Sequence, residues 1–192
     1  MVRFDRYTMP AIVLHWLVAA MVFAQFTLGW WMQEIAKQPP GPRVSAFNLH
    51  KSIGITIFLL MVARIAWRAT HPPPALPAMP RWQAVLARAN HAILYAALVA
   101  LPATGYLGSE FSGYPVRFFG VTLPSWAGEQ PQLKELMSSL HYWTTWVLAA
   151  AFLAHLGGVI KHTCIDRDGL LARMGWGRPA LDSDLTCARR ED

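Results

Sequence analysis

Four of the seven histidines in the sequence lie in or beside long uncharged stretches: His15, His50, His141 and His155. An imidazole without a partner is costly in an apolar environment, so a histidine at such a position indicates a functional site. His141 and His155 are fourteen residues apart. In one helix this spacing places them within about 40° of the same face and about 21 Å apart along the axis. It suits two cofactors stacked one above the other.

The apolar residues around these histidines are grouped in four long stretches. Of the 192 residues, 54% are hydrophobic and 15% are charged, a composition that excludes an ordinary soluble domain. A helix that crosses about 30 Å of hydrocarbon needs roughly 20 residues. We predict four spans, over about residues 11–32, 50–67, 90–109 and 138–160, with Pro102 as a tolerated kink.

Short connections between these spans favour an up-and-down arrangement. The predicted fold is therefore an all-α, four-helix transmembrane up-and-down bundle. It forms one domain over residues 1–179, followed by a disordered cytoplasmic tail over residues 180–192. Five prolines in residues 71–80 predict an extended linker between the second and third spans. The glycines and prolines of the third loop predict an irregular connection there.

The Lys and Arg residues are distributed unevenly between the two sides of this bundle. The N-terminus, the second loop and the C-terminal tail hold twelve of the 17, and the first and third loops hold five. Because positive charge collects in cytoplasmic loops, both termini are predicted to be cytoplasmic. The net charge of +6 then reflects these loops and not a nucleic-acid-binding surface.

This orientation pairs the four histidines by depth. His15 and His155 lie at the cytoplasmic level, and His50 and His141 lie at the outer level. An iron with an axial imidazole on each side satisfies each pair and leaves no open coordination position, which favours electron transfer over oxygen chemistry. A zinc site would normally show three or four protein ligands, and these pairs lack the cysteines or carboxylates.

The nature of the predicted haems follows from the cysteines. Cys164 and Cys187 form no C-x-x-C-H motif, so covalent attachment is excluded and two non-covalent haems b are predicted. Arg64 lies fourteen residues after His50, hence on the same face at the cytoplasmic level. Its guanidinium could pair with haem propionates, or it could belong only to the positive charge of the cytoplasmic side.

Several short blocks, taken in this order, resemble the bacterial cytochrome b561 family over about residues 7–175. The blocks are His15-Trp16-Leu17, Leu49-His50-Lys51-Ser52-Ile53-Gly54, Arg64-Ile65-Ala66-Trp67-Arg68, His91 before an apolar span, Leu140-His141 with His155, and Lys161-His162 through Ile165-Asp166-Arg167-Asp168. Each block is short, and their order makes the resemblance specific.

The resemblance implies a dihaem, four-helix cytochrome b of the bacterial inner membrane that exchanges electrons with ubiquinone, and it implies the same four histidine ligands. A family member of this kind oxidises superoxide on the outer side and passes the electron to quinone. By this resemblance the chain is expected to be an oxidoreductase with superoxide, or another small periplasmic donor, as its substrate.

Two further residues are candidate contacts in this reading. His91 begins the third span at the cytoplasmic level, and it could hydrogen-bond a quinone carbonyl or a propionate, or simply cap the bundle. Lys51 directly follows His50, and it could steer an anion toward the outer haem or anchor the helix at the membrane interface. His71 and His162 are interpreted as surface residues.

Two other functions stay open at this point. The chain could be a haem b membrane subunit that passes electrons between a separate redox partner protein and the quinone pool. It could also be a helical membrane protein without a cofactor.

Overall fold

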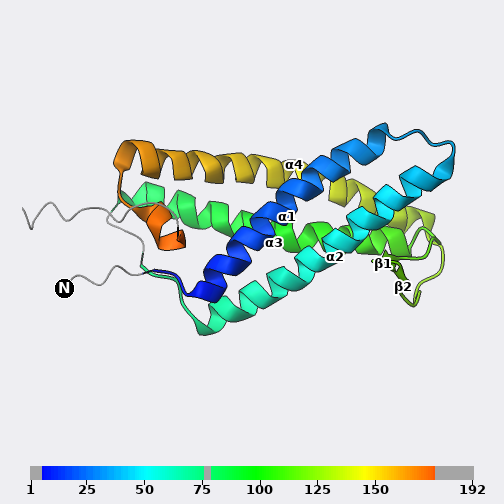
Figure 1. Cartoon of the computed structure of the whole chain (residues 1–192), viewed down its shortest axis with the longest axis horizontal. Coiled ribbons are helices and arrows are strands. Elements are labelled where there is room, and N and C mark those ends of the chain that lie inside the picture. Colours follow the sequence, from blue (N-terminus) through cyan, green and yellow to red (C-terminus); the bar gives the residue numbers. More distant parts are fainter. Residues whose placement is uncertain (1–5, 76–78, 176–192) are drawn as a thin grey trace, which may run out of the picture.

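A computed structural model of the chain describes residues 6–75 and 79–175. Four long helices pack as a bundle: α1 (Met9–Glu34), α2 (Pro40–Thr70), α3 (Arg81–Glu110) and α4 (Pro131–Ile160). Successive helices run in opposite directions along the long axis (Figure 1). All four are long and apolar enough to cross a membrane. The predicted all-α four-helix bundle is confirmed.

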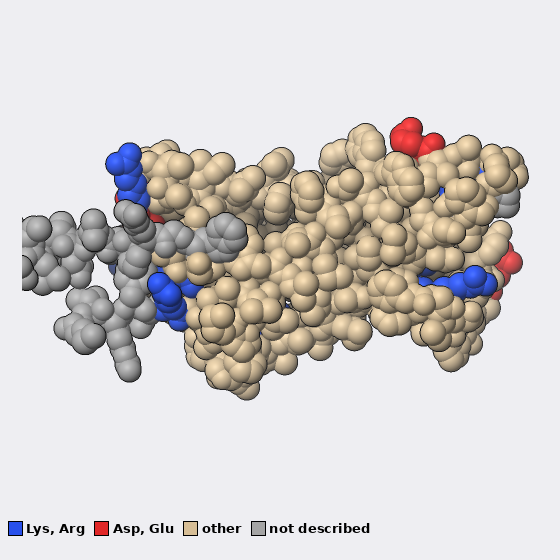
Figure 2. All heavy atoms as spheres, viewed as in Figure 1, with Lys and Arg blue, Asp and Glu red and all other residues tan. Residues whose placement is uncertain are grey.

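The charged residues are separated from the apolar middle of the bundle. On the face seen in Figure 2, Lys, Arg, Asp and Glu gather at the two ends, and the long central part shows none of them. Such a band is what the hydrocarbon layer requires, because a charged side chain there is costly.

Prolines mark where the helices begin and end. A proline occupies the first turn of α1, α2 and α4, where its missing N–H would be unpaired in any case and its fixed φ suits a helix. Pro80 directly precedes α3. α2 ends at Thr70, and His71 follows as its C-cap in a non-helical conformation, because a residue before a proline, here Pro72, avoids the helical region.

The helices are longer than the stretches predicted to lie in the membrane. α2 begins at Pro40 and not near residue 50, and α3 begins at Arg81 and not near residue 90. The helical hydrogen bonds of the backbone continue beyond the apolar residues into turns that carry charged side chains. Hydropathy assigns these turns to water, so it does not include them in the spans. A helix of 30 residues is about 45 Å long and exceeds the hydrocarbon thickness of about 30 Å. The limits of the spans therefore stay a prediction.

The connection between α3 and α4 contains a short antiparallel ribbon that the sequence analysis did not predict. Strand β1 (Arg117–Phe118) pairs with β2 (Val121–Thr122), and β1 packs against α2 (Figure 1). The hydroxyl of Ser52, a residue only 1% exposed, accepts the N–H of Phe119 at 2.9 Å. Phe119 has a φ of 46°, which bulky residues rarely adopt, and this hydrogen bond holds it there. The ribbon is thus attached two residues from His50.

Glu110, the last residue of α3, holds the rest of this connection. Its buried carboxylate accepts the Ser125 hydroxyl at 2.6 Å and the backbone N–H groups of Trp126 and Ala127 at 2.7 and 3.0 Å. Three donors around one oxygen compensate for the removal of the charge from water.

A layer of apolar side chains fills the middle of the bundle. Leu148 is seven residues, about two helical turns, from both His141 and His155. Ile57 takes the corresponding place in α2, seven residues after His50. The buried members of this layer are Val18, Val22, Ile57, Met61, Ala97 and Leu148. We call this set the middle layer.

The chain after α4 folds back toward the start of α1. The helix continues into a π-helical turn, η1 (Lys161–Asp166), and left-handed residues then reverse the chain into the short helix η2 (Leu170–Met174). The carbonyl of Met174 accepts the indole N–H of Trp16 at 3.0 Å. The predicted tail over residues 180–192 lies outside the described residues, and the domain limit at residue 179 stays a prediction.

Replacing Glu110 with alanine should remove the buried carboxylate that accepts from Ser125, Trp126 and Ala127. We expect the free energy of unfolding in detergent to fall by about 2–3 kcal/mol, as for the loss of hydrogen bonds to a charged group. Glu135→Ala, at an exposed position of α4, is the control and should change it by less than about 0.5 kcal/mol. Equal losses in the two variants would contradict this account of Glu110.

Candidate functional site

Two of the histidines meet at the end of the bundle that carries β1 and β2. His50 comes from α2 and His141 from α4, and their ring centroids are 6.3 Å apart with the ring planes at 70°. We call these two residues the ribbon pair.

Two further histidines meet at the end where the described chain begins and finishes. His15 comes from α1 and His155 from α4, with ring centroids 6.2 Å apart and ring planes at 65°. We call these two residues the terminal pair. The bundle thus brings together the same histidines that the sequence pairs by depth, and their role as iron ligands stays a prediction.

The separation within each pair fits one metal ion between the rings. With metal–nitrogen bonds of about 2.0 Å, an ion midway between two imidazoles separates the ring centroids by about 6.3 Å. One nitrogen ligand on each of two opposite sides is the donor set of a haem iron with two axial histidines. The residues at both pairs therefore fit haem b.

The second ring nitrogen of His141 supports this reading. Its Nδ1 lies 2.9 Å from the carbonyl oxygen of Leu101 and 3.3 Å from the hydroxyl of Thr104, both in α3. A carbonyl oxygen only accepts, so Nδ1 carries the proton and Nε2 keeps a free lone pair. Histidines that bind metals usually have this arrangement, which orients the ring.

His50 differs from its partner because its Nδ1 is buried and has no hydrogen-bond partner among the residues that the structure describes. Its backbone carbonyl accepts the side-chain N–H of Gln25 in α1 at 2.7 Å. The oxygen Oε1 of Gln25 is also buried and unpaired within the same described residues. Buried polar atoms are seldom left unpaired, so these two atoms mark a site built for more than packing.

Two glycines leave room for the rings of the ribbon pair. A Cβ on Gly105 in α3 would lie 3.2 Å from Cε1 and 3.3 Å from Nδ1 of His141. A Cβ on Gly29 in α1 would lie 3.4 Å from Cε1 of His50. The sequence analysis singled out neither glycine, since nothing in the local pattern reveals which helix faces the ring.

Arg64 lies at the terminal pair, as predicted from its spacing to His50. Its Nη2 is 3.3 Å from Nδ1 of His15, its Nη1 donates to the carbonyl of Ala11 at 3.2 Å, and its Nε donates to the hydroxyl of Tyr95 at 2.9 Å. One guanidinium thereby connects α1, α2 and α3. A pairing with haem propionates stays a prediction.

His91 also lies at the terminal pair. Its ring centroid is 5.4 Å from that of His155, and its Nδ1 is 2.7 Å from the carbonyl oxygen of Ala87. Since the carbonyl can only accept, the neutral ring has its free lone pair on Nε2. The side chain of His91 is exposed.

Lys51 is half-buried beside the ribbon pair, next to His50 in the chain. The attachment of β1 to Ser52 brings the backbone of Arg117 close to the same turn of α2, with its carbonyl oxygen 3.3 Å from the Ser52 hydroxyl. Lys51 and Arg117, two basic residues at this end of the bundle, therefore lie on segments that pack against each other.

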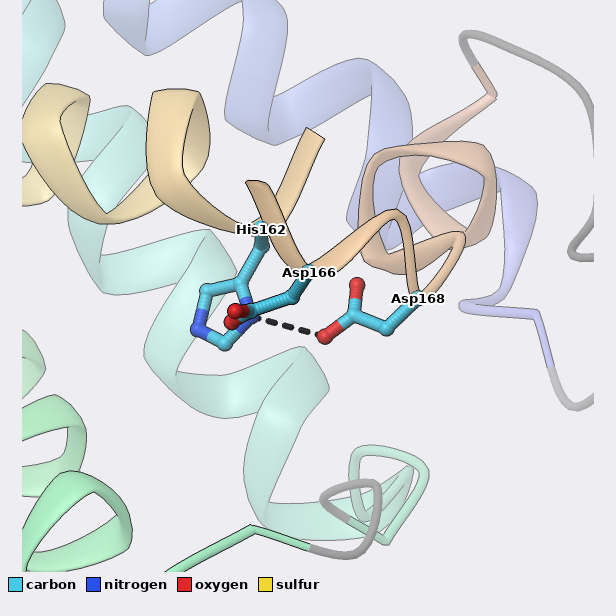
Figure 3. A group of neighbouring side chains, drawn as sticks. All are labelled: His162, Asp166 and Asp168. Atoms are coloured by element: carbon cyan, nitrogen blue, oxygen red, sulfur yellow. Dashed lines mark hydrogen bonds and ion pairs between the residues drawn. The ribbon is translucent and has the colours of Figure 1, made fainter. Parts of the chain in front are cut away.

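His162, which the sequence analysis interpreted as a surface residue, is only partly exposed and contacts two carboxylates. Its Nδ1 lies 2.7 Å from a carboxylate oxygen of Asp168 and 3.2 Å from one of Asp166 (Figure 3), and its side chain is 18% exposed. Lys161 is ion-paired with Asp166. The contact between His162 and Asp166 follows from their i, i+4 spacing in the sequence. The contact with Asp168 instead depends on Arg167, whose left-handed conformation turns the chain back toward His162. His71 is exposed and stacks on Trp67 with centroids 3.9 Å apart.

Comparison with known proteins adds an independent line of evidence. A family model described as prokaryotic cytochrome b561 matches residues 6–177. The chain is 35% identical over 172 residues to cytochrome b561 homolog 2 of Escherichia coli (strain K12), covering 88% of this chain and 91% of that protein. It is 29% identical over 178 residues to cytochrome b561 homolog 1 of the same organism, covering 88% and 97%. A Yersinia pestis protein named probable superoxide oxidase CybB is 25% identical over 171 residues, covering 88% and 95%.

Replacing Gly105 with valine should displace the ring of His141, because even a Cβ at this position is in tight contact with it. We expect the haem content of the purified protein to fall, as measured by a pyridine haemochrome assay, because one ring of the ribbon pair is displaced. The control is Gly157→Val in α4, where an added Cβ meets nothing within 4 Å. An unchanged haem content in Gly105→Val would contradict the tight fit around His141.

Proposed function

The chain belongs to the prokaryotic cytochrome b561 family, and on this premise we propose that it is a dihaem oxidoreductase that carries electrons across the bacterial inner membrane to ubiquinone. The donor is superoxide or another small periplasmic molecule. Each histidine pair holds one haem b, the ribbon pair on the outer side and the terminal pair on the cytoplasmic side. Both termini are then cytoplasmic, as the distribution of Lys and Arg favours.

The observation that carries this proposal is the matching geometry of the two pairs. Ring centroids at 6.2 and 6.3 Å occur at both ends of one bundle, and one helix, α4, supplies a ring to each pair. Hydrogen-bonded core histidines would have no reason to repeat one metal-binding separation at two depths.

When bound, each haem would supply reversible one-electron transfer. His15 with His155 and His50 with His141 would hold the two haems, and the carbonyl of Leu101 orients His141. The middle layer separates the two pairs with apolar side chains and keeps water from the path between them. The protein thus supplies positions and a dry interior.

The terminal pair suits a quinone acceptor. Quinone reduction to quinol takes two electrons and two protons, so two superoxide anions yield two dioxygen molecules for each quinol. His91 is exposed beside His155, and its Nε2 can accept a bond from a quinol hydroxyl when neutral or donate to a quinone carbonyl when protonated.

Superoxide as the donor is supported by the name of the Yersinia pestis relative at 25% identity, whereas the Escherichia coli relatives are named only as cytochrome b561 homologs. An anionic donor also suits the half-buried Lys51 beside the ribbon pair. The donor is therefore the part of the proposal that most needs an experiment.

That experiment is stopped-flow reduction of the purified protein by superoxide, with and without a soluble ubiquinone. Superoxide should reduce the haems, and ubiquinone should reoxidise them. Absence of reduction by superoxide, together with co-purification of a redox protein, would instead favour a haem b subunit that serves a separate partner.

Single histidine variants should remove one haem at a time. The wild type should contain two haems b per chain, extractable by acidic acetone. His15→Ala or His155→Ala should remove the cytoplasmic haem, and His50→Ala or His141→Ala the outer one, because each haem loses an axial ligand. Pyridine haemochrome titration and redox titration measure both effects. If His15→Ala and His141→Ala disturb the same haem, the pairing is wrong.

Lys51→Glu should slow reduction by superoxide, since it replaces an attractive charge near the outer haem with a repulsive one. The rate should fall with ionic strength in the wild type and rise with it in the variant, because screening acts over about 8 Å at physiological salt. Lys37→Glu makes the same charge change at an exposed position of the first loop and should have little effect. Equal rates for Lys51→Glu and wild type at every salt concentration would exclude steering by Lys51.

A further inference from the structure

The helices α1 and α2 hold each other's histidines by reciprocal polar contacts. At the ribbon pair, Gln25 of α1 donates to the backbone carbonyl of His50 in α2 at 2.7 Å. At the terminal pair, Arg64 of α2 reaches Nδ1 of His15 and the carbonyl of Ala11 in α1. The first contact is made by a neutral amide and the second by a permanent cation.

Tyr95 holds this cation in place. Its hydroxyl accepts the Nε–H of Arg64 at 2.9 Å, and the guanidinium groups of Arg64 and Arg68 lie 5.7 and 5.6 Å from the centre of its ring. None of the ion pairs within the described ranges involves Arg64. The half-buried charge of Arg64 is therefore not compensated by a carboxylate in that part of the chain.

We infer that Arg64, positioned by Tyr95, raises the reduction potential of the cytoplasmic haem above that of the outer haem and so sets the direction of electron transfer. The inference rests on the proposed function, because it requires a haem at each pair. A haem iron gains one electron on reduction and so carries one positive charge fewer. A fixed neighbouring cation therefore favours the reduced form, and a low dielectric strengthens the effect.

The contacts of the ribbon pair act in the opposite direction. The Nδ1–H of His141 donates to the carbonyl of Leu101, which makes the ring a stronger ligand and favours the oxidised iron. Lys51 is also cationic at this end, but none of the hydrogen bonds and ion pairs of the described residues holds its ammonium in place. Arg64 is instead fixed by its hydrogen bonds to the hydroxyl of Tyr95 and the carbonyl of Ala11.

Arginine only donates, so Nδ1 of His15 accepts in its contact with Arg64. With an iron on Nε2 the ring proton would lie on Nδ1, and this hydrogen bond would be lost. The carbonyl of Ala11 and the hydroxyl of Tyr95 hold the guanidinium independently of that proton. The charge therefore stays beside the ring.

The test is potentiometric titration of Arg64→Gln, with the haem content measured first. Two haems per chain in the wild type support the proposed function whatever the potentials, and one or none in the wild type would overturn it separately. With both haems present, Arg64→Gln should lower the midpoint potential of the cytoplasmic haem and leave that of the outer haem unchanged, so that the gap between them shrinks. The same variant in a His141→Ala background, which keeps only the cytoplasmic haem, assigns the shift.

Matched variants separate charge from structure. Arg64→Lys keeps a cation and should stay nearer the wild-type potential than Arg64→Gln. Arg68→Gln removes a cation that contacts Tyr95, and it should have the smaller effect. If Arg64→Gln does not retain haem, Tyr95→Phe, which removes only the hydroxyl, should lower the same midpoint by a smaller amount. A cytoplasmic midpoint that is unchanged or raised in Arg64→Gln, or in Tyr95→Phe where Arg64→Gln loses its haem, would overturn the inference, as would equal shifts of both haems.

Discussion

An imidazole in an apolar layer needs a partner for its ring nitrogens, and the rest of this structure depends on how that need is met. Each pair brings two rings from different helices to centroid separations of 6.2 and 6.3 Å, and under the proposed function a haem iron would be the partner of both rings. Because α4 contributes to both pairs, His141 and His155 must lie on one face of one helix, which a spacing of fourteen residues achieves. α1 and α2 then need to supply only one ring each.

The same spacing determines what lies between the pairs. Steps of seven residues return to nearly the same helix face, so Leu148 in α4 and Ile57 in α2 point into the bundle at its centre. Together with the other residues of the middle layer they form the core that holds the helices together. Packing and electrical insulation of the two sites are thus provided by the same side chains.

Polar groups orient the histidines of the two pairs, which the middle layer separates. Leu101 orients His141, Gln25 holds the turn that carries His50, and Arg64 lies against His15. The first two groups are neutral and the third is charged, so the two ends of a similar scaffold have different electrostatic environments. At the ribbon end, Ser52 also connects the site to the α3–α4 connection, which limits how freely that connection moves.

The sequence by itself determined the four helices and the pairing of the four histidines. It also determined the end of the bundle at which Arg64, His91 and Lys51 lie. These follow from hydropathy, from a repeat of 3.6 residues and from charge near the ends of spans, all of which are local properties of the chain. Only the tertiary structure decided that Gly105 faces His141, that Gln25 reaches His50 and that Tyr95 holds Arg64. These contacts depend on the rotation of each helix about its own axis, which packing of all four helices sets together. The approach of Asp168 to His162 depends likewise on one left-handed residue, whose conformation no local pattern reveals.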